Sequence, residues 1–174
     1  IAFMEISGGP VTAVGENGTI LRTTNEGTTW MPIASGTTAT LRDISDFNFH
    51  VVGDSGTILR TTDNGLSWYQ VPRVTTRRLN AVSNGFSGIA CGDSGMILLR
   101  QSSVSDIWSA ANSGTAADLH GIPMFSSKDI VVGDMGLILR STNFGGAWFP
   151  QNSRTTTRLN HAEYSTNNTS RVYC

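Results

Sequence analysis

Four arginines lie directly beside regularly spaced leucines, where their guanidinium groups could bind an anion together. They are Arg42, Arg77, Arg78 and Arg158, next to or near Leu41, Leu79 and Leu159. A guanidinium is a planar fork of N–H donors that suits carboxylates and phosphates. The four arginines therefore predict a binding site for an anionic ligand or an acidic peptide, provided that the fold gathers the leucines in one place. Solvated arginines at the beginnings of strands are the alternative interpretation.

A second set of arginines ends short apolar runs: Arg22, Arg60, Arg100 and Arg140. Arg60 lies six residues after Asp54, and six strand residues span about 20 Å, so these two cannot pair within one hairpin. We expect Arg60 to lie across a hairpin from Trp68, where stacking on the indole is feasible. A structural role is therefore predicted for this set.

The histidines and tyrosines form no recognisable catalytic or metal-binding set. His50, His120 and His161 lack metal-ligand spacing, so we predict surface or loop histidines and no metal. A sialidase needs an arginine triad, a nucleophilic tyrosine and a paired carboxylate. Three tyrosines are present outside any such context, namely Tyr69, Tyr164 and Tyr173. A glycosidase that uses a carboxylate pair such as Asp43 and Asp118 stays open, because such pairs are recognised by distance. We predict no enzyme activity and no cofactor.

Two independent sets of residues repeat with one period. The tryptophans are Trp30, Trp68, Trp108 and Trp148, separated by 38, 40 and 40 residues. The leucines are Leu41, Leu79, Leu119 and Leu159, with the same separations, and Phe3 lies 38 residues before the first. The chain therefore consists of repeats, approximately 1–36, 37–74, 75–114 and 115–154, with a partial one at 155–174. A period of about 40 residues is typical of propellers and other arrays.

Each repeat predicts four short strands. In the second repeat these are residues 41–45, 50–53, 56–60 and 67–71. Ile58 and Leu59 are adjacent and apolar, which favours strands that are covered on both faces. Short strands joined by turns and repeated at this spacing indicate an all-β fold, the β-propeller of four-stranded antiparallel blades. About four blades and part of a fifth are present, the latter with a first strand at 159–162, so we predict a fragment of a larger propeller. Its open edge would be completed by further blades or by a neighbouring chain; a small closed ring is the alternative.

The turn between the second and third strands has the pattern Gly-acid-x-Gly. It occurs at Gly15–Gly18, Gly53–Gly56, Gly92–Gly95 and Gly133–Gly136. We expect both glycines to supply positive φ and the acidic side chain to accept N–H groups of its own turn. A phosphate-binding loop would need a following helix and a Lys-Ser/Thr pair, and the sequence has neither here.

The turn between the third and fourth strands, residues 61–68, resembles the Asp-box or bacterial neuraminidase repeat, with close copies at 23–30 and 141–148. In this interpretation the carboxylate folds back onto the turn, the glycine is left-handed and the indole closes the hairpin. The residues concerned are Asn25, Gly27, Trp30, Asp63, Gly65, Trp68, Asn143, Gly145 and Trp148, with Trp108 in the third copy. That copy has serines in place of the Asp and Gly, and one extra residue at Leu98-Leu99 precedes it, so we expect it to be the least regular.

The continuous string VGDSGTILRTTDNGLSW at 52–68 resembles the photosystem II assembly and stability factor family of propellers. Sialidase repeats share its second half but not usually its first. The resemblance covers essentially the whole chain. It implies a seven-bladed, non-enzymatic scaffold in the thylakoid lumen or bacterial periplasm that acts on nascent reaction-centre protein, with an arginine-rich surface patch.

Composition agrees with a turn-rich protein, and the presence of a single lysine, Lys128, is commoner outside the cytosol. The 174 residues include 19 glycines, and only 14% are charged, against about 25% in average soluble domains. The net charge of -1 gives no field that would recruit nucleic acid. Cys91 is expected to be a small buried residue, and with Cys174 it cannot define a disulfide framework. No apolar run is long enough to span a membrane.

We therefore predict a scaffold for protein partners, among which segments of membrane proteins are candidates. A secreted carbohydrate-active or glycan-binding protein is the first alternative. A structural subunit of an extracellular or phage assembly is the second.

Overall fold

The computed structural model describes residues 2–4, 9–45, 50–83, 88–102, 106–123, 129–164 and 172–173. The described residues are almost all β, in four four-stranded antiparallel sheets and one two-stranded sheet. In each large sheet the strands are neighbours in the order in which the chain forms them, which is the topology of a propeller blade. This confirms the predicted fold class.

The bounds of the strands follow the repeat. The first blade contains β1 (Ala2–Met4), β2 (Val11–Val14), β3 (Ile20–Thr23) and β4 (Met31–Pro32). The second contains β5 (Leu41–Ile44), β6 (His50–Gly53), β7 (Ile58–Arg60) and β8 (Tyr69–Gln70). The third contains β9 (Leu79–Ser83), β10 (Ile89–Gly92), β11 (Ile97–Arg100) and β12 (Trp108–Ala111). The fourth contains β13 (Leu119–Gly121), β14 (Ile130–Gly133), β15 (Ile138–Arg140) and β16 (Phe149–Gln151). The small sheet pairs β17 (Glu163–Tyr164) with β18 (Val172–Tyr173).

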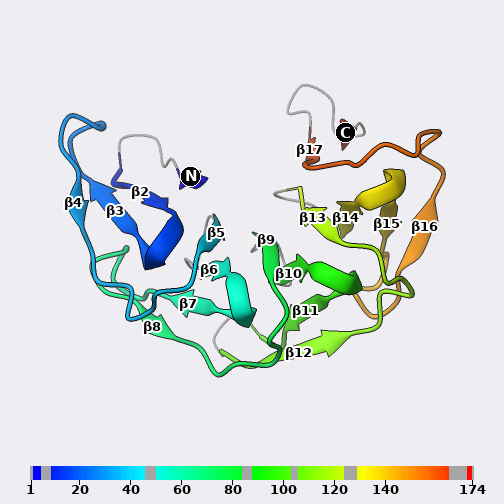
Figure 1. Ribbon diagram of the computed structural model, residues 1–174, viewed down its shortest axis with the longest axis horizontal. Helices are drawn as coiled ribbons and strands as arrows, with labels where there is room; N and C mark the ends of the chain where they lie inside the picture. The colour runs from blue at the N-terminus through cyan, green and yellow to red at the C-terminus, as the bar shows by residue number, and fades with distance from the viewer. Residues whose placement is uncertain are drawn as a thin grey trace.

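The four blades stand side by side in an open arc around a common centre (Figure 1). The first strands β5, β9 and β13 lie innermost, and the fourth strands β4, β8, β12 and β16 lie outermost. The two ends of the chain face each other across the opening of the arc (Figure 1). Residues that begin the inner strands are therefore gathered near the centre, as the arginine hypothesis requires.

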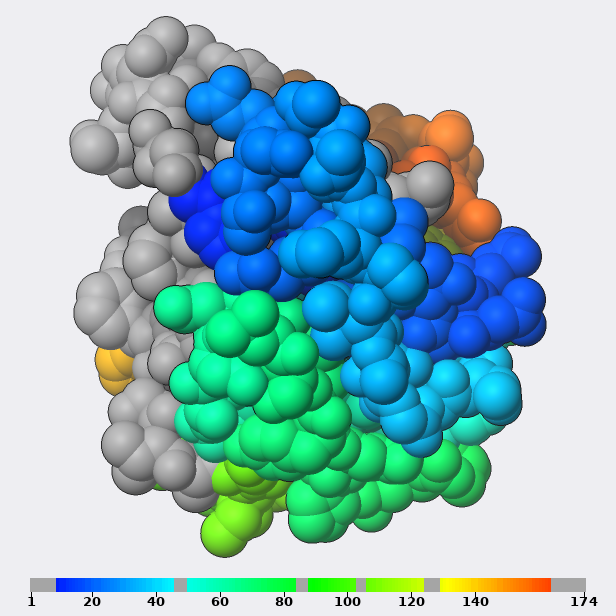
Figure 2. All heavy atoms as spheres, turned by 90° about the vertical axis from the view of Figure 1, so that its left-hand side faces the viewer, coloured from blue at the N-terminus to red at the C-terminus, as the bar shows by residue number. Residues whose placement is uncertain are grey.

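Each interface between blades is an apolar cluster that uses both faces of a blade. Leu59 packs with Val14 and Ile20 of the first blade, whereas its neighbour Ile58 packs with Leu98 of the third. Both side chains are at most 1% exposed, so burial contributes about 1.5–3 kcal/mol for each. Figure 2 shows the atoms of the first blade lying directly against those of the second. Adjacent apolar residues thus occur because neighbouring blades cover both faces of the strand, as the sequence indicated.

The tryptophans mark the same interfaces. Trp68, Trp108 and Trp148 are 9%, 4% and 8% exposed and each belongs to one interblade cluster. Trp30 is half-buried, because no blade precedes the first in the described part of the chain. Cys91 is fully buried in the cluster between the third and fourth blades, as expected; Cys174 lies outside the described residues.

Three register details differ from the sequence interpretation. Phe3 pairs with Ala13 as Ile44 pairs with Val51, so Phe3 takes the place of Ile44 rather than that of a repeat leucine. The fifth repeat pairs from Glu163, and residues 159–162 precede the strand. The third blade also differs, at Arg100, and is described with the site below.

No helix in the described part of the chain is long and apolar enough to cross a membrane.

Candidate functional site

The Gly-acid-x-Gly segments, here called mouth turns, are tight hairpin turns on one side of the arc. In the second blade Ser55 and Gly56 have φ of 56° and 68°, and the N–H of Thr57 donates to the carbonyl oxygen of Asp54 at 3.1 Å. Two successive positive φ values with this hydrogen bond define a type I′ turn, whose twist matches that of the paired strands. The expectation of two left-handed glycines was half wrong, since Gly53 is extended with φ of -169°.

The first glycine is needed for a different reason, the close approach of another backbone segment. A Cβ atom added at Gly53 would lie 2.2 Å from the carbonyl oxygen of Thr40, and one at Gly92 would lie 1.9 Å from that of Arg78. The segments that lead into β5, β9 and β13 therefore lie directly over the mouth turns of their own blades. This packing brings the residues beside the repeat leucines next to the turn carboxylates.

In the second blade two arginines share one carboxylate. Arg42 donates from Nε and Nη2 to the two oxygens of Asp54, at 2.5 and 3.3 Å. Arg78, which begins the third blade, places its Nε 3.2 Å from the same carboxylate and 3.7 Å from Asp93. The hydrogen bond from Arg42 is the main cause that lowers the pKa of Asp54. The expectation that this carboxylate caps its own turn was wrong, because its partners are arginine side chains.

The fourth blade repeats the arrangement with a histidine. His120 Nε2 and Arg158 Nε lie 2.9 and 2.7 Å from Oδ1 of Asp134. The hydrogen bond from Arg158 and then that from His120 lower the pKa of Asp134. The prediction of surface or loop histidines was wrong for His120, whose side chain is 15% exposed, and for His50, which is fully buried against Trp108. It is confirmed for His161, which is 68% exposed.

The third blade has equivalent contacts, made by side chains and backbone groups. Together with those of the second and fourth blades they form a series of polar contacts around the mouth turns, here called the ring. Asn80 donates to Asp93 Oδ1 at 3.1 Å. Arg77 Nη1 donates to the carbonyl oxygen of Ser94 at 3.2 Å, and the N–H of Ser94 donates to Asp118 at 2.7 Å. The residues after Leu41, Leu79 and Leu119 thus contact the turn of their own blade. The side chains before Leu79, Leu119 and Leu159 reach the turn of the preceding blade.

All four predicted arginines consequently lie on one mouth of the arc, yet none is an isolated cation. Arg42, Arg78 and Arg158 are in ion pairs and Arg77 binds a carbonyl oxygen. Arg78 and Arg158 are held through Nε alone, and in the described part of the chain their Nη groups take part in no hydrogen bond. These Nη groups are donors that remain available at the surface.

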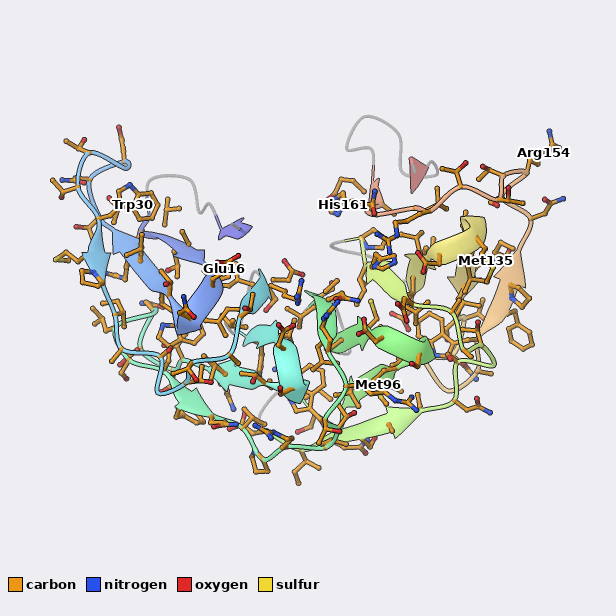
Figure 3. All side chains as sticks on the ribbon, viewed as in Figure 1. Glu16, Trp30, Met96, Met135, Arg154 and His161 are labelled. Carbon is orange, nitrogen blue, oxygen red and sulfur yellow. The ribbon has the colours of Figure 1, made fainter. Side chains whose placement is uncertain are left out.

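A groove of about 950 Å³ opens beside this ring at the first blade. Its lining includes Leu21, Trp30, Glu16, Arg42, Asn80 and His120. Figure 3 shows Glu16 and Trp30 on the first-blade side of the opening and His161 on the opposite side. Glu16 is the exception among the turn acids, since no described residue forms an ion pair with its carboxylate.

The turns between third and fourth strands, here called outer hairpins, lie at the other end of the strands. In the second blade the predicted positions of the carboxylate and of the left-handed glycine are confirmed. Asp63 Oδ1 accepts the N–H of Ser67 at 2.9 Å, and Gly65 is left-handed with φ of 80°. Hydrogen bonds from the Ser67 hydroxyl and backbone lower the pKa of Asp63 to about 2. Asn25 and Asn143 accept the equivalent N–H groups at 2.9 Å.

Arg22 connects the first blade to the outer hairpin of the second, and Arg60 connects the second blade to that of the third. Arg22 Nε donates to the carbonyl oxygen of Asn64 at 3.1 Å, and Arg60 forms an ion pair with Asp106. The register places Tyr69 opposite Arg60. The expected stacking of Arg60 on Trp68 is therefore replaced by an ion pair with the third blade.

The third blade departs from its sisters by one position. Leu99 pairs with Ile89 as Arg60 pairs with His50. Leu99 therefore takes the place of Arg60, and Arg100 takes the place of Thr61. The strand pairs without a bulge, so the extra residue lies between Arg100 and Trp108. Ser103 and Ser105, where irregularity was expected, lie outside the described residues.

Sequence reasoning missed Asn80, His120 and Asp118 as members of the ring. Their signal was position, because they precede or follow a repeat leucine as the arginines do. Asp43 and Asp118, the considered carboxylate pair, each bind a backbone N–H, those of Val82 and Ser94. No cluster of three or more metal-ligating residues occurs among the residues that the structure describes.

Comparisons with known proteins agree with this architecture. Neither a family model nor a curated protein matches the sequence. The solved structure "YCF48 bound to D1 peptide" superposes with a TM-score of 0.71 at 20% identity, over 95% of this chain and 56% of that one. YCF48 from Cyanidioschyzon merolae gives 0.67 at 18% identity, over 96% and 60%. The chain thus spans less than two thirds of these structures. In fold, it is a β-propeller segment similar to YCF48.

Proposed function

We propose that this chain is a non-catalytic scaffold that binds an extended segment of a partner protein at the mouth of the arc. The observation that supports this most directly is that a carboxylate holds Arg78 and Arg158 through Nε, while the two side chains are still 47% and 55% exposed. Fixing a long side chain before binding lowers the entropy that binding costs. Carboxylate or carbonyl oxygens of a partner are the acceptors that such donors suit.

The mouth has mixed charge, which favours a polypeptide over a simple polyanion. The acids Glu16, Asp54 and Asp134 alternate with the arginines around the ring. A polyanion would meet these carboxylates, whereas a polypeptide can offer carbonyl oxygens, carboxylates and N–H groups in turn. One propeller of this fold has been solved as YCF48 bound to D1 peptide, which supports a peptide as the kind of ligand.

We further propose a location outside the cytosol and a role similar to that of photosystem II assembly factors. The resemblance of residues 52–68 to that family and the shared fold support this proposal. Segments of membrane proteins would then be the partners, and nucleic acid would not be one.

The test is binding of the chain to an array of extended peptides of graded net charge. Arg77→Gln together with Arg78→Gln should weaken binding to acidic peptides at least tenfold. Melting temperature should change little, because half-exposed ion pairs contribute about 0–1 kcal/mol. The matched control is Arg73→Gln with Arg154→Gln, the same charge change at two exposed linker positions. Equal losses in both pairs, or no peptide binding by the unaltered chain, would overturn the proposal.

A further inference from the structure

Arg100 is an unusual residue for the position it occupies. In the second and fourth blades a hydroxyl lies there, and Thr61 and Ser141 accept the N–H groups of Gly65 and Gly145 at 3.0 and 2.9 Å. A guanidinium has no acceptor and cannot replace these hydrogen bonds. The hairpin itself therefore gives no reason for an arginine.

Arg100 is also buried, and two of its three guanidinium nitrogens have no partner. The residue is 6% exposed, and its Nε and Nη1 atoms are shielded from solvent with no hydrogen bond. A buried charge that is neither paired nor hydrogen-bonded is strongly unfavourable. Such a group is normally found with a counter-ion.

The nearby carboxylate is already used. One oxygen of Asp106 pairs with Arg60, and the other accepts the hydroxyl of Tyr69 at 2.9 Å. Arg60 in addition keeps a buried Nε without a partner. Burial, and then the positive charge of Arg60, lower the pKa of Arg100, while Asp106 opposes this. Arg60 is 14% exposed and pairs with Asp106, whereas Arg100 forms no ion pair with this carboxylate, so a net positive charge is left between the second and third blades.

We propose that Arg60 and Arg100 bind a small inorganic anion, with chloride as the representative, at this junction. The anion balances the second positive charge and accepts hydrogen bonds from the guanidinium groups. The anion has to be small because the surrounding side chains leave little of Arg100 exposed. Asp54 and Arg60 lie at opposite ends of β6 and β7, so this site is independent of the mouth.

The experiment replaces gluconate by chloride at constant ionic strength and follows thermal unfolding of the full chain. A ligand that binds only the folded state raises the melting temperature, here by on the order of 3 °C for a domain of this size. Arg100→Thr restores the hydroxyl of the sister blades and should remove the chloride response. Arg140→Thr makes the same charge change at the end of β15 and should keep it.

Line broadening of the chloride NMR signal provides a readout that does not depend on unfolding. Broadening by the unaltered chain that disappears in Arg100→Thr supports the site. Phosphate in place of chloride tests the size limit and should produce no comparable shift. Equal melting responses of the unaltered chain and Arg100→Thr, or no chloride broadening, would show that Arg100 is buried without a bound anion.

Discussion

Arg22 in the first blade donates from Nε to the carbonyl oxygen of Asn64 in the second, at 3.1 Å. Arg22 is 7% exposed and lies near Gly65, where an added Cβ would be 3.7 Å from Arg22 Cδ. Arg22 thus packs against the left-handed glycine of the neighbouring blade. The outer hairpin is consequently a contact between blades as well as a turn.

We predict that Arg22→Met weakens this contact. Methionine keeps the apolar stem but leaves the Asn64 carbonyl oxygen without its donor, which costs about 1–3 kcal/mol of unfolding free energy. Urea denaturation measures the change. Arg140→Met is the control, because no described residue forms a hydrogen bond with Arg140. Equal losses in the two variants would contradict the role of the interblade hydrogen bond.

A second prediction compares two glycines that have the same backbone conformation and different surroundings. Gly53 and Gly15 are both extended, with φ of -169° and -168°. A Cβ at Gly53 would meet the Thr40 carbonyl oxygen at 2.2 Å, whereas one at Gly15 has no described atom within 4 Å. Gly53→Ala should therefore destabilise the chain by about 1–3 kcal/mol, as overpacking does, and Gly15→Ala by much less. Chemical denaturation of both variants checks this, and similar values for the two would refute the packing explanation.

The blades could be predicted from the sequence because one four-stranded unit is repeated along the chain. Trp68 and Leu79 recur at fixed spacing, and each requires the same neighbours in every blade. Glycine positions likewise report backbone requirements, although Gly53 shows that a glycine can be needed for close approach rather than for positive φ.

The pairing of side chains could not be predicted, because it joins different blades. Arg78 and Asp54 are 24 residues apart in the sequence, and they form an ion pair because the second and third blades lie side by side. The sequence gives no direction for either side chain. The place of Arg100 was mistaken for a different reason. Its run of residues matches the sister strands, and strand pairing alone shows that Leu99 has moved into the arginine position.

A third prediction concerns the tryptophans at the interfaces. Trp148 is 8% exposed in the cluster between the third and fourth blades, whereas Trp30 is half-buried beside the groove. Trp148→Ala should cost about 3–5 kcal/mol, the usual loss for a buried aromatic residue. Trp30→Ala should cost clearly less. Thermal unfolding of the two variants tests the order, and a larger loss for Trp30→Ala would mean that its face is covered in solution.

The last prediction concerns the pH dependence of stability at Asp63. Hydrogen bonds from Ser67 lower the pKa of this carboxyl from 3.8 to about 2 in the folded chain. A carboxyl with a lowered folded pKa stabilises the protein above its unfolded pKa, and this stabilisation is lost as the pH falls through the folded value. Asp63 should therefore contribute fully above pH 3.8 and progressively less toward pH 2.

Asp63→Asn isolates this contribution, because Asn25 and Asn143 already accept the equivalent N–H groups in the sister hairpins. An amide keeps the acceptor oxygen and removes the titration. The melting temperature of the unaltered chain should exceed that of Asp63→Asn at neutral pH, and the difference should shrink between pH 4 and 2. A difference that stays constant across this range would mean that the carboxyl does not titrate with a lowered pKa.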